Sequence, residues 1–250
     1  MIILSLLIPF FGTALGGATV FFMKKEPGDS LRRLLTGFAA GVMIAASVWS
    51  LLLPAIDASL PPRWLQPTAG FLFGCAFLMV CESVCARMQK AGNMHRSAPT
   101  NHKMLLFAVT LHNIPEGLAV GVGVAAALKE QSAASMAAAF GLALGIAIQN
   151  FPEGAIISLP LSAEGYSKPK AFLFGVLSGA VEPVSALVTL LLTALVIKVL
   201  PFMLAFAAGA MVYVCVSELI PETKGSGKIN AGVVGFIAGF LLMMVLDVSL

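Results

Sequence analysis

Two short segments inside apolar stretches carry the side chains with the greatest capacity for chemistry. Their sequences are His-Asn-Ile-Pro-Glu-Gly at 112–117 and Gln-Asn-Phe-Pro-Glu-Gly at 149–154. In each segment a potential metal donor stands four residues before a glutamate, and residues four apart lie on one face of an α-helix. A carboxylate inside a bilayer costs about 2.5–3.5 kcal/mol. Two carboxylates in matching positions therefore predict an intramembrane site for a cation.

The donor atoms of the two segments indicate which cation this would be. His112 offers an imidazole nitrogen and Gln149 offers an amide oxygen. Glu116 and Glu153 each add a carboxylate. Such a mixed set favours Zn²⁺, Fe²⁺, Mn²⁺ or Co²⁺ over Cu⁺, which prefers sulfur, and over Mg²⁺ and Ca²⁺, which prefer oxygen alone. We expect these four side chains to converge on one metal ion.

Prolines inside both segments predict kinked helices. Pro115 and Pro152 lack an N–H and leave the carbonyl one turn earlier without its helical donor. In lipid, a free carbonyl is tolerated only where protein, water or a ligand satisfies it. Gly117 and Gly154 remove side chains beside the two glutamates and permit close helix approach. The two helices are therefore expected to meet at their kinks.

Three further polar residues predict a second, weaker cation position beside the first. Asn113 and Asn150 each follow the first donor of their segment, about 100° around the helix. Glu182 is another carboxylate in an apolar stretch, and no Lys or Arg lies at mid-span to pair with these acids. The alternative for such carboxylates is a protonated acid that is hydrogen-bonded between helices.

The composition of the chain excludes a soluble globular domain. Hydrophobic residues make up 59% of the 250 residues and charged residues 11%, whereas soluble domains carry about 25% charged residues. Each apolar run is long enough to cross a hydrocarbon core about 30 Å thick. We predict one all-α membrane domain over 1–250 with eight transmembrane helices, at about 1–23, 34–56, 67–88, 104–128, 133–161, 170–197, 201–221 and 229–248.

Positively charged residues predict the orientation of these spans, because cytoplasmic loops are enriched in Lys and Arg. Of the 15 Lys and Arg residues, the even-numbered loops hold Arg63, Lys129 and Lys198, and the odd-numbered loops hold the others. The odd-numbered loops are therefore expected in the cytoplasm and both termini outside it. The same asymmetry accounts for the net charge of +3, which gives no indication of nucleic-acid binding.

The paired motifs, Glu182-Pro183 in span six and the segment 217–222 in span seven resemble the ZIP (ZRT/IRT-like) family of divalent-metal transporters. The resemblance implies an inverted repeat, with spans one to three related to spans six to eight around the Pro-kinked helices four and five. It also implies metal import by alternating access, in which spans one, four, five and six move relative to the other four.

The resemblance further implies roles for individual residues. The primary metal site would consist of His112, Glu116, Gln149 and Glu153, and a neighbouring position of Asn113, Asn150, Glu153 and Glu182. Met43 and Ser50 resemble residues on the entrance side, and Glu218 resembles a carboxylate on the exit side. Gln149 stands where many members have His, and Asn150 where some have Asp. Loss of a charged donor should weaken the second position, so two metal ions are not expected to bind tightly at once.

Zinc is the expected substrate, followed by Fe²⁺ and Mn²⁺, with Cd²⁺ a further candidate, and no other cofactor is implied. The resemblance also makes a homodimer plausible. The short third loop and the compact length favour a bacterial inner membrane. His95 and His102 lie in this loop, and their role stays open between weak metal capture and solvated loop residues.

Two other functions remain open from the sequence. A carrier for another cation, or for a proton-coupled solute, could reuse the buried glutamates but would not need His112. An intramembrane metalloenzyme usually presents two histidines around a glutamate, as in H-E-x-x-H. Only one histidine lies well within the predicted spans, which disfavours the enzyme.

Overall fold

A computed structural model describes residues 1–22, 28–91, 102–163, 165–196, 199–225 and 230–249. Within these ranges the side chains are described except those at 85–86, 88–91, 102–112, 156, 163 and 193. The side chains of His102 and His112 and the whole of His95 therefore lie outside the described residues.

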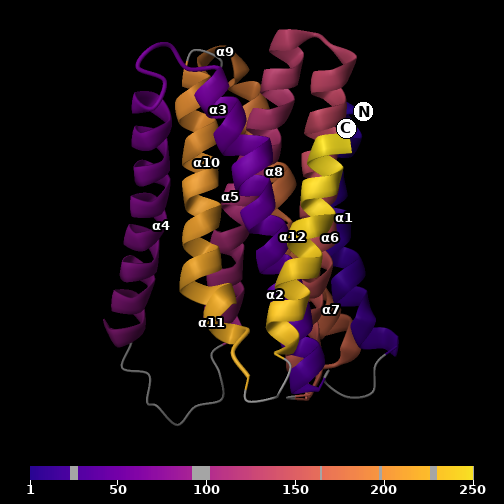
Figure 1. The fold of residues 1–250 in the computed structure, drawn as a ribbon. Helices are drawn as coiled ribbons and strands as arrows, with labels where there is room; N and C mark the ends of the chain where they lie inside the picture. The colour runs from indigo at the N-terminus through magenta and orange to yellow at the C-terminus, as the bar shows by residue number, and fades with distance from the viewer. Residues whose placement is uncertain (23–27, 92–101, 164, 197–198, 226–229, 250) are drawn as a thin grey trace.

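All regular structure in the described residues is helical, as predicted, and the helices form a bundle (Figure 1). The elements are α1 (Ile2–Phe22), α2 (Asp29–Ala46), the π-helical η1 (Ser47–Leu52), α3 (Leu53–Asp57), α4 (Leu65–Ala91), α5 (His102–Glu130), α6 (Ala133–Ala163), α7 (Lys168–Gly179), α8 (Val181–Leu191), α9 (Thr193–Val196), α10 (Leu200–Val214), the π-helical η3 (Cys215–Leu219), α11 (Ile220–Glu222) and α12 (Ala231–Ser249).

Seven segments in the described part of the chain are long and apolar enough to cross a membrane. They are Ile2–Phe22, Asp29–Asp57, Leu65–Val84, Ala133–Ser162, Lys168–Leu191, Leu200–Glu222 and Ala231–Ser249. Helix α5, with 29 residues, is not among these seven segments. The predicted count of eight spans stays a prediction.

Close helix pairs make up the bundle: α1 packs on α6, α2 on α12, α4 on α10 and α5 on α8. Without a hydrophobic driving force between helices in lipid, such pairs depend on small residues at their crossings. A Cβ on Gly12 of α1 would lie 2.1 Å from the carbonyl oxygen of Ala147 on α6. A Cβ on Gly117 of α5 would lie 2.3 Å from the carbonyl oxygen of Glu182 on α8. Only glycine permits these two approaches.

The span expected at 170–197 is divided into shorter helices. Helix α7 ends at Gly179 and α8 begins at Val181. Pro183 lies in the first turn of α8 and lacks the N–H that would otherwise bond the carbonyl of Gly179. The interruption places Glu182 at the start of a new helix. By contrast, α5 and α6 remain helical through Pro115 and Pro152, and the kinks expected there stay predictions.

Candidate metal site

Helices α5 and α6 bring Glu116 and Gln149 together in the interior of the bundle, as their motif spacing predicts. Glu116 is 1% exposed and Gln149 is fully buried. The Gln149 Nε2 donates a hydrogen bond of 2.6 Å to the Glu116 Oε1. The Glu116 Oε2 and the Gln149 Oε1 are buried and have no hydrogen-bond partner among the described residues. Two oxygen atoms suited to a cation thus belong to one bonded pair.

A second polar cluster surrounds Glu182, which is also 1% exposed. Its Oε1 accepts hydrogen bonds from the Thr13 hydroxyl at 2.9 Å and from the Asn113 Nδ2 at 2.8 Å. Its Oε2 accepts a bond of 2.8 Å from the Asn150 Nδ2. The Asn113 Nδ2 also lies 3.3 Å from the carbonyl oxygen of Ser178. One carboxylate therefore joins side chains from α1, α5, α6 and α8.

The two clusters are close enough to interact. The carboxylates of Glu153 and Glu182 lie near enough to Glu116 for charge repulsion, and Asn150 lies within reach of Glu116 as well. The hydrogen-bond donors described for Glu116 and Glu182 are all neutral amides or hydroxyls. A cation bound between the clusters would relieve the repulsion among the acids.

The structure brings together most of the residues predicted for the metal site. Glu116, Gln149, Asn113, Asn150 and Glu182 are buried and hydrogen-bonded within the two clusters. Glu153 follows on the same face of α6 and is half-buried. His112 belongs to α5, one turn before Glu116, but its side chain lies outside the described residues. Among the side chains that are described, no three His, Cys, Asp or Glu residues form a group that could hold a metal.

The residues predicted along the pathway belong to α2, η1 and η3. Met43 is buried in α2, and the half-buried Ser50 lies in η1. Ser50 donates a hydrogen bond to Asp247 of α12, and both residues line a cavity of about 230 Å³ together with Glu130. Glu218 is half-buried in η3.

Two polar residues of these sites were not predicted from the sequence: Asp247 beside Ser50, and Thr13 beside Glu182. Asp247 is the one charged residue in the segment 231–250, and its Oδ2 is buried without a hydrogen-bond partner among the described residues. A single charged residue in an apolar span indicates a functional position, so Asp247 could have been found from the sequence. Thr13 carried no such signal, because a threonine in an apolar helix commonly bonds its own backbone.

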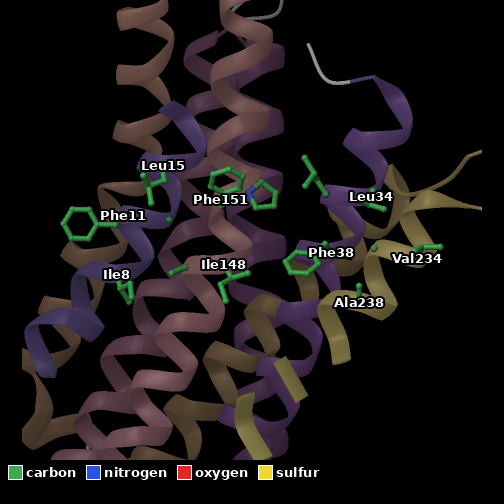
Figure 2. Close-up of a pocket in the computed structure, with 14 residues that line it drawn as sticks. Ile8, Phe11, Leu15, Leu34, Phe38, Ile148, Phe151, Val234 and Ala238 are labelled. Carbon is green, nitrogen blue, oxygen red and sulfur yellow. The ribbon is translucent and has the colours of Figure 1, made fainter. Parts of the chain in front are cut away.

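The larger hollow of about 540 Å³ does not suit a metal ion (Figure 2). It lies between the α1–α6 pair and the α2–α12 pair, and Figure 2 shows side chains such as Phe11, Phe38 and Phe151 along it. Apolar carbon atoms offer no ligand to a divalent ion. This groove therefore separates two pairs of helices without forming part of the polar site.

Comparison with known proteins agrees with the motifs and the fold. The model of a family described as ZIP Zinc transporter matches residues 88–247. The chain is 35% identical to Zinc transporter ZIP11 of Xenopus tropicalis, over 99% of this chain and 96% of the relative. It is 37% identical to Zinc transporter GufA of Myxococcus xanthus, over 96% of this chain and 95% of the relative.

A third relative, Zinc transporter ZIPB of Bordetella bronchiseptica, is 34% identical over 96% of this chain and 78% of its own length. The matches cover nearly the whole chain, and the seven apolar helices are those of a multi-pass integral membrane protein. The chain belongs to the ZIP zinc transporter family.

Proposed function

We propose that this protein carries divalent transition-metal ions, zinc foremost, across the membrane into the cytoplasm. The observation that carries the proposal is the buried pair of Glu116 and Gln149, which leaves two oxygens without hydrogen-bond partners among the described residues. Buried polar atoms are normally paired, so these oxygens are available to a ligand. The names of the relatives, all zinc transporters, favour zinc as that ligand. Fe²⁺, Mn²⁺ and Cd²⁺ fit the same donors.

In this proposal the primary site holds one ion between α5 and α6. Its ligands are His112, Glu116, Gln149 and Glu153. Asn113, Asn150 and Glu182 form the adjacent polar position, where a second ion binds at most weakly. The donors at that position include two neutral amides, which attract a cation less than carboxylates do.

If α5 also crosses the membrane, the chain has eight spans. The pairing of the helices then agrees with an inverted repeat. In such a repeat the first three spans correspond to the last three in order, and α5 corresponds to α6. The contact between α1 and α6 then corresponds to the contact between α8 and α5. In the same way, the contact between α2 and α12 corresponds to the contact between α10 and α4. The π-helical segments η1 and η3 correspond as well, and each is followed closely by a proline, Pro54 or Pro221. Figure 1 places both ends of the chain at one end of the bundle, which an even number of spans requires.

Alternating access would arise from movement between two helix groups. We define the site group as α1, α5, α6, α7 and α8, and the frame group as α2, α4, α10 and α12 with η1 and η3. The groove in Figure 2 lies between α1 and α6 of the site group and α2 and α12 of the frame group. Movement along this boundary would expose the metal alternately to the two sides.

Basic residues gather near the starts of α2 and α7, at the end of the bundle opposite the termini, which supports an orientation with both termini outside the cytoplasm. Lys168 at the start of α7 donates a hydrogen bond of 3.1 Å to the carbonyl oxygen of Phe21 near the end of α1. Arg32 and Arg33 lie near the start of α2 at the same end. Cytoplasmic ends are enriched in such residues. Metal would then enter past Ser50 and Met43 and leave past Glu218.

The membrane and the assembly remain part of the proposal. A bacterial inner membrane agrees with the short loops, and Myxococcus xanthus and Bordetella bronchiseptica supply two of the relatives. The homodimer that the family resemblance implies stays a prediction.

Uptake of radioactive zinc into proteoliposomes tests the proposed function. We expect zinc to accumulate only in vesicles that contain the protein. Unlabelled Cd²⁺, Fe²⁺ and Mn²⁺ should compete with it, because they accept mixed nitrogen and oxygen ligands, whereas Mg²⁺ should not. Accumulation equal to that of protein-free vesicles, or equal competition by Mg²⁺, would contradict the proposal.

The variant His112→Ala separates metal transport from transport of another solute. Loss of the nitrogen ligand should reduce zinc uptake at least about tenfold. Loss of a hydrogen-bond partner of a metal ligand already lowers metal affinity or activity by about that factor, and loss of a ligand should cost no less. A carrier for another solute that needs only the buried glutamates would transport that solute equally well with and without His112. Membership of a transporter family leaves no support for an intramembrane metalloenzyme.

A further inference from the structure

A third cavity, of about 500 Å³, opens between α3 and α4. Leu52 and Ile56 line one wall, and Pro67, Phe71 and Leu72 of α4 line the other. Helix α4 packs chiefly on α10 and only slightly on α3, so the two walls are held apart. Figure 1 shows the connection from α3 to α4 at the same end of the bundle as the termini. The cavity has the volume of a typical site for a small organic ligand.

The cavity spans the boundary between hydrocarbon and headgroups at this end. One apolar segment ends at Asp57 and the next begins at Leu65. Leu72 lies seven residues after Leu65, which is about 10 Å at 1.5 Å per residue. Trp64 directly precedes the second segment and is 63% exposed, and tryptophan is enriched at the level of lipid headgroups. The inner part of the cavity therefore faces acyl chains, and its mouth faces headgroups.

A basic side chain stands at this mouth. Arg63 lines the cavity beside Trp64 and is exposed. The ion pairs among the described residues join Asp29 to Arg32 and Arg33, and the Arg63 guanidinium has no partner in that part of the chain. The first turn of α4 contains no acidic residue that would repel an anion. A guanidinium binds phosphate through two parallel hydrogen bonds, so a phosphate group fits this position.

We propose that this cavity binds one phospholipid with a net negative headgroup, whose phosphate lies on Arg63 while an acyl chain lies between α3 and α4. The surrounding bilayer presents acyl chains to the apolar walls and phosphates to the guanidinium at these same depths. A basic residue at the membrane surface attracts anionic lipids, and a zwitterionic headgroup adds a positive charge that opposes Arg63. The bound lipid would join α3 to α4, whose direct contact is slight. The inference goes beyond metal transport and does not depend on it.

A second copy of the chain fits the same surface less well. Copies related by a two-fold axis present the same patch to one another. An interface centred on this cavity would therefore bring two Arg63 side chains together, and the first turn of α4 offers no carboxylate to either of them. A phospholipid instead brings the opposite charge together with the apolar chain.

Native mass spectrometry of the purified full chain tests the proposal. The protein is released from detergent micelles that contain equal amounts of phosphatidylglycerol and phosphatidylcholine with identical acyl chains, and the added mass identifies the bound lipid. We expect one lipid per chain, with phosphatidylglycerol preferred about fivefold, the usual contribution of one basic residue near an anionic lipid. Arg63→Gln removes the charge and should bind the two lipids almost equally.

Lys129→Gln is the matched control. Lys129 is also an exposed basic residue at this end of the bundle, in the last turn of α5, but it does not line the cavity. Its loss should leave the preference unchanged. Equal losses of preference in Arg63→Gln and Lys129→Gln would overturn the proposal, because the overall charge would then be responsible. An unchanged preference in Arg63→Gln, or none in the wild type, would overturn it as well.

Thr68→Phe tests the apolar part of the site separately. Thr68 is exposed and lines the cavity, so a larger apolar side chain there fills the space proposed for the acyl chain. We expect this variant to lose binding of both lipids. Unchanged binding would show that no acyl chain lies between α3 and α4. A wild type that carries no lipid and forms a dimer that Thr68→Phe dissociates would assign the cavity to a second copy and overturn the proposal.

Discussion

Replacement of Glu116 by glutamine is expected to reduce the initial rate of zinc uptake by at least about a hundredfold. Glu116 is 1% exposed and its Oε2 has no hydrogen-bond partner among the described residues, so this charged oxygen is available to a cation. Loss of partners outside a ligand shell already costs about tenfold to a hundredfold, and loss of a charged ligand should cost no less. Uptake into proteoliposomes with equal amounts of reconstituted protein measures the effect.

Glutamine is the sharpest replacement at this position. It matches glutamate in size, and its side-chain oxygen still accepts the bond from the Gln149 Nε2, so packing is kept while the charge is removed. Glu222→Gln is the matched control, because Glu222 is exposed on α11 and its change should leave uptake unaffected. Glu116→Gln uptake within about threefold of the wild type would contradict the assignment.

Glu153→Ala should also abolish uptake of zinc, because it removes a second proposed carboxylate ligand. Near-normal uptake by this variant would remove Glu153 from the proposed ligands.

The second large effect is expected on stability, from Gly12→Ala. The added Cβ would lie 2.1 Å from the carbonyl oxygen of Ala147, and a backbone atom cannot rotate away as a side chain can. The α1–α6 pair must therefore separate. Overpacking typically costs about 1–3 kcal/mol, which corresponds to a decrease in Tm of roughly 3–10 °C for a chain of this size. Thermal unfolding of the purified protein measures the change.

Gly28→Ala is the control for this substitution. Gly28 precedes α2, and a Cβ there would meet no atom within 4 Å. Gly28 is also the N-cap of α2, where alanine is less favourable than glycine by on the order of 0.5–1 kcal/mol. We therefore expect a decrease in Tm of about 1–4 °C for the control, and a larger decrease for Gly12→Ala would report the clash itself. Equal Tm values for Gly12→Ala and the wild type would mean that α1 and α6 can adjust their separation freely.

The local parts of the site could be predicted from the sequence because they depend on spacing alone. The four-residue interval between Gln149 and Glu153 places both on one face of α6. The repetition of the motif predicts that α5 and α6 meet, and the bond between Gln149 and Glu116 agrees with this. Hydropathy likewise located seven of the predicted spans, because a minimum length of apolar sequence is needed to cross a bilayer.

Other features could not be predicted because they depend on packing between distant segments. The bond from Thr13 to Glu182 requires α1 to lie beside α8, and no periodicity within either helix indicates that contact. Which atom of Asn113 or Asn150 faces a carboxylate is decided by the neighbours of the amide. The interruption before Glu182 is intermediate, because Pro183 signals a break but does not exclude a continuous, bent helix.

The hydrogen bonds between helices are distributed in a way that bears on the rate of transport. Those of Thr13, Asn113 and Gln149 join members of the site group. Those of Ser50 with Asp247 and of Tyr213 with Glu82 join members of the frame group. A relative movement of the two groups would leave these described hydrogen bonds intact and would shift the carbon contacts along the groove. These described hydrogen bonds should therefore add little to the barrier to such a movement, and each group can move as a unit during transport.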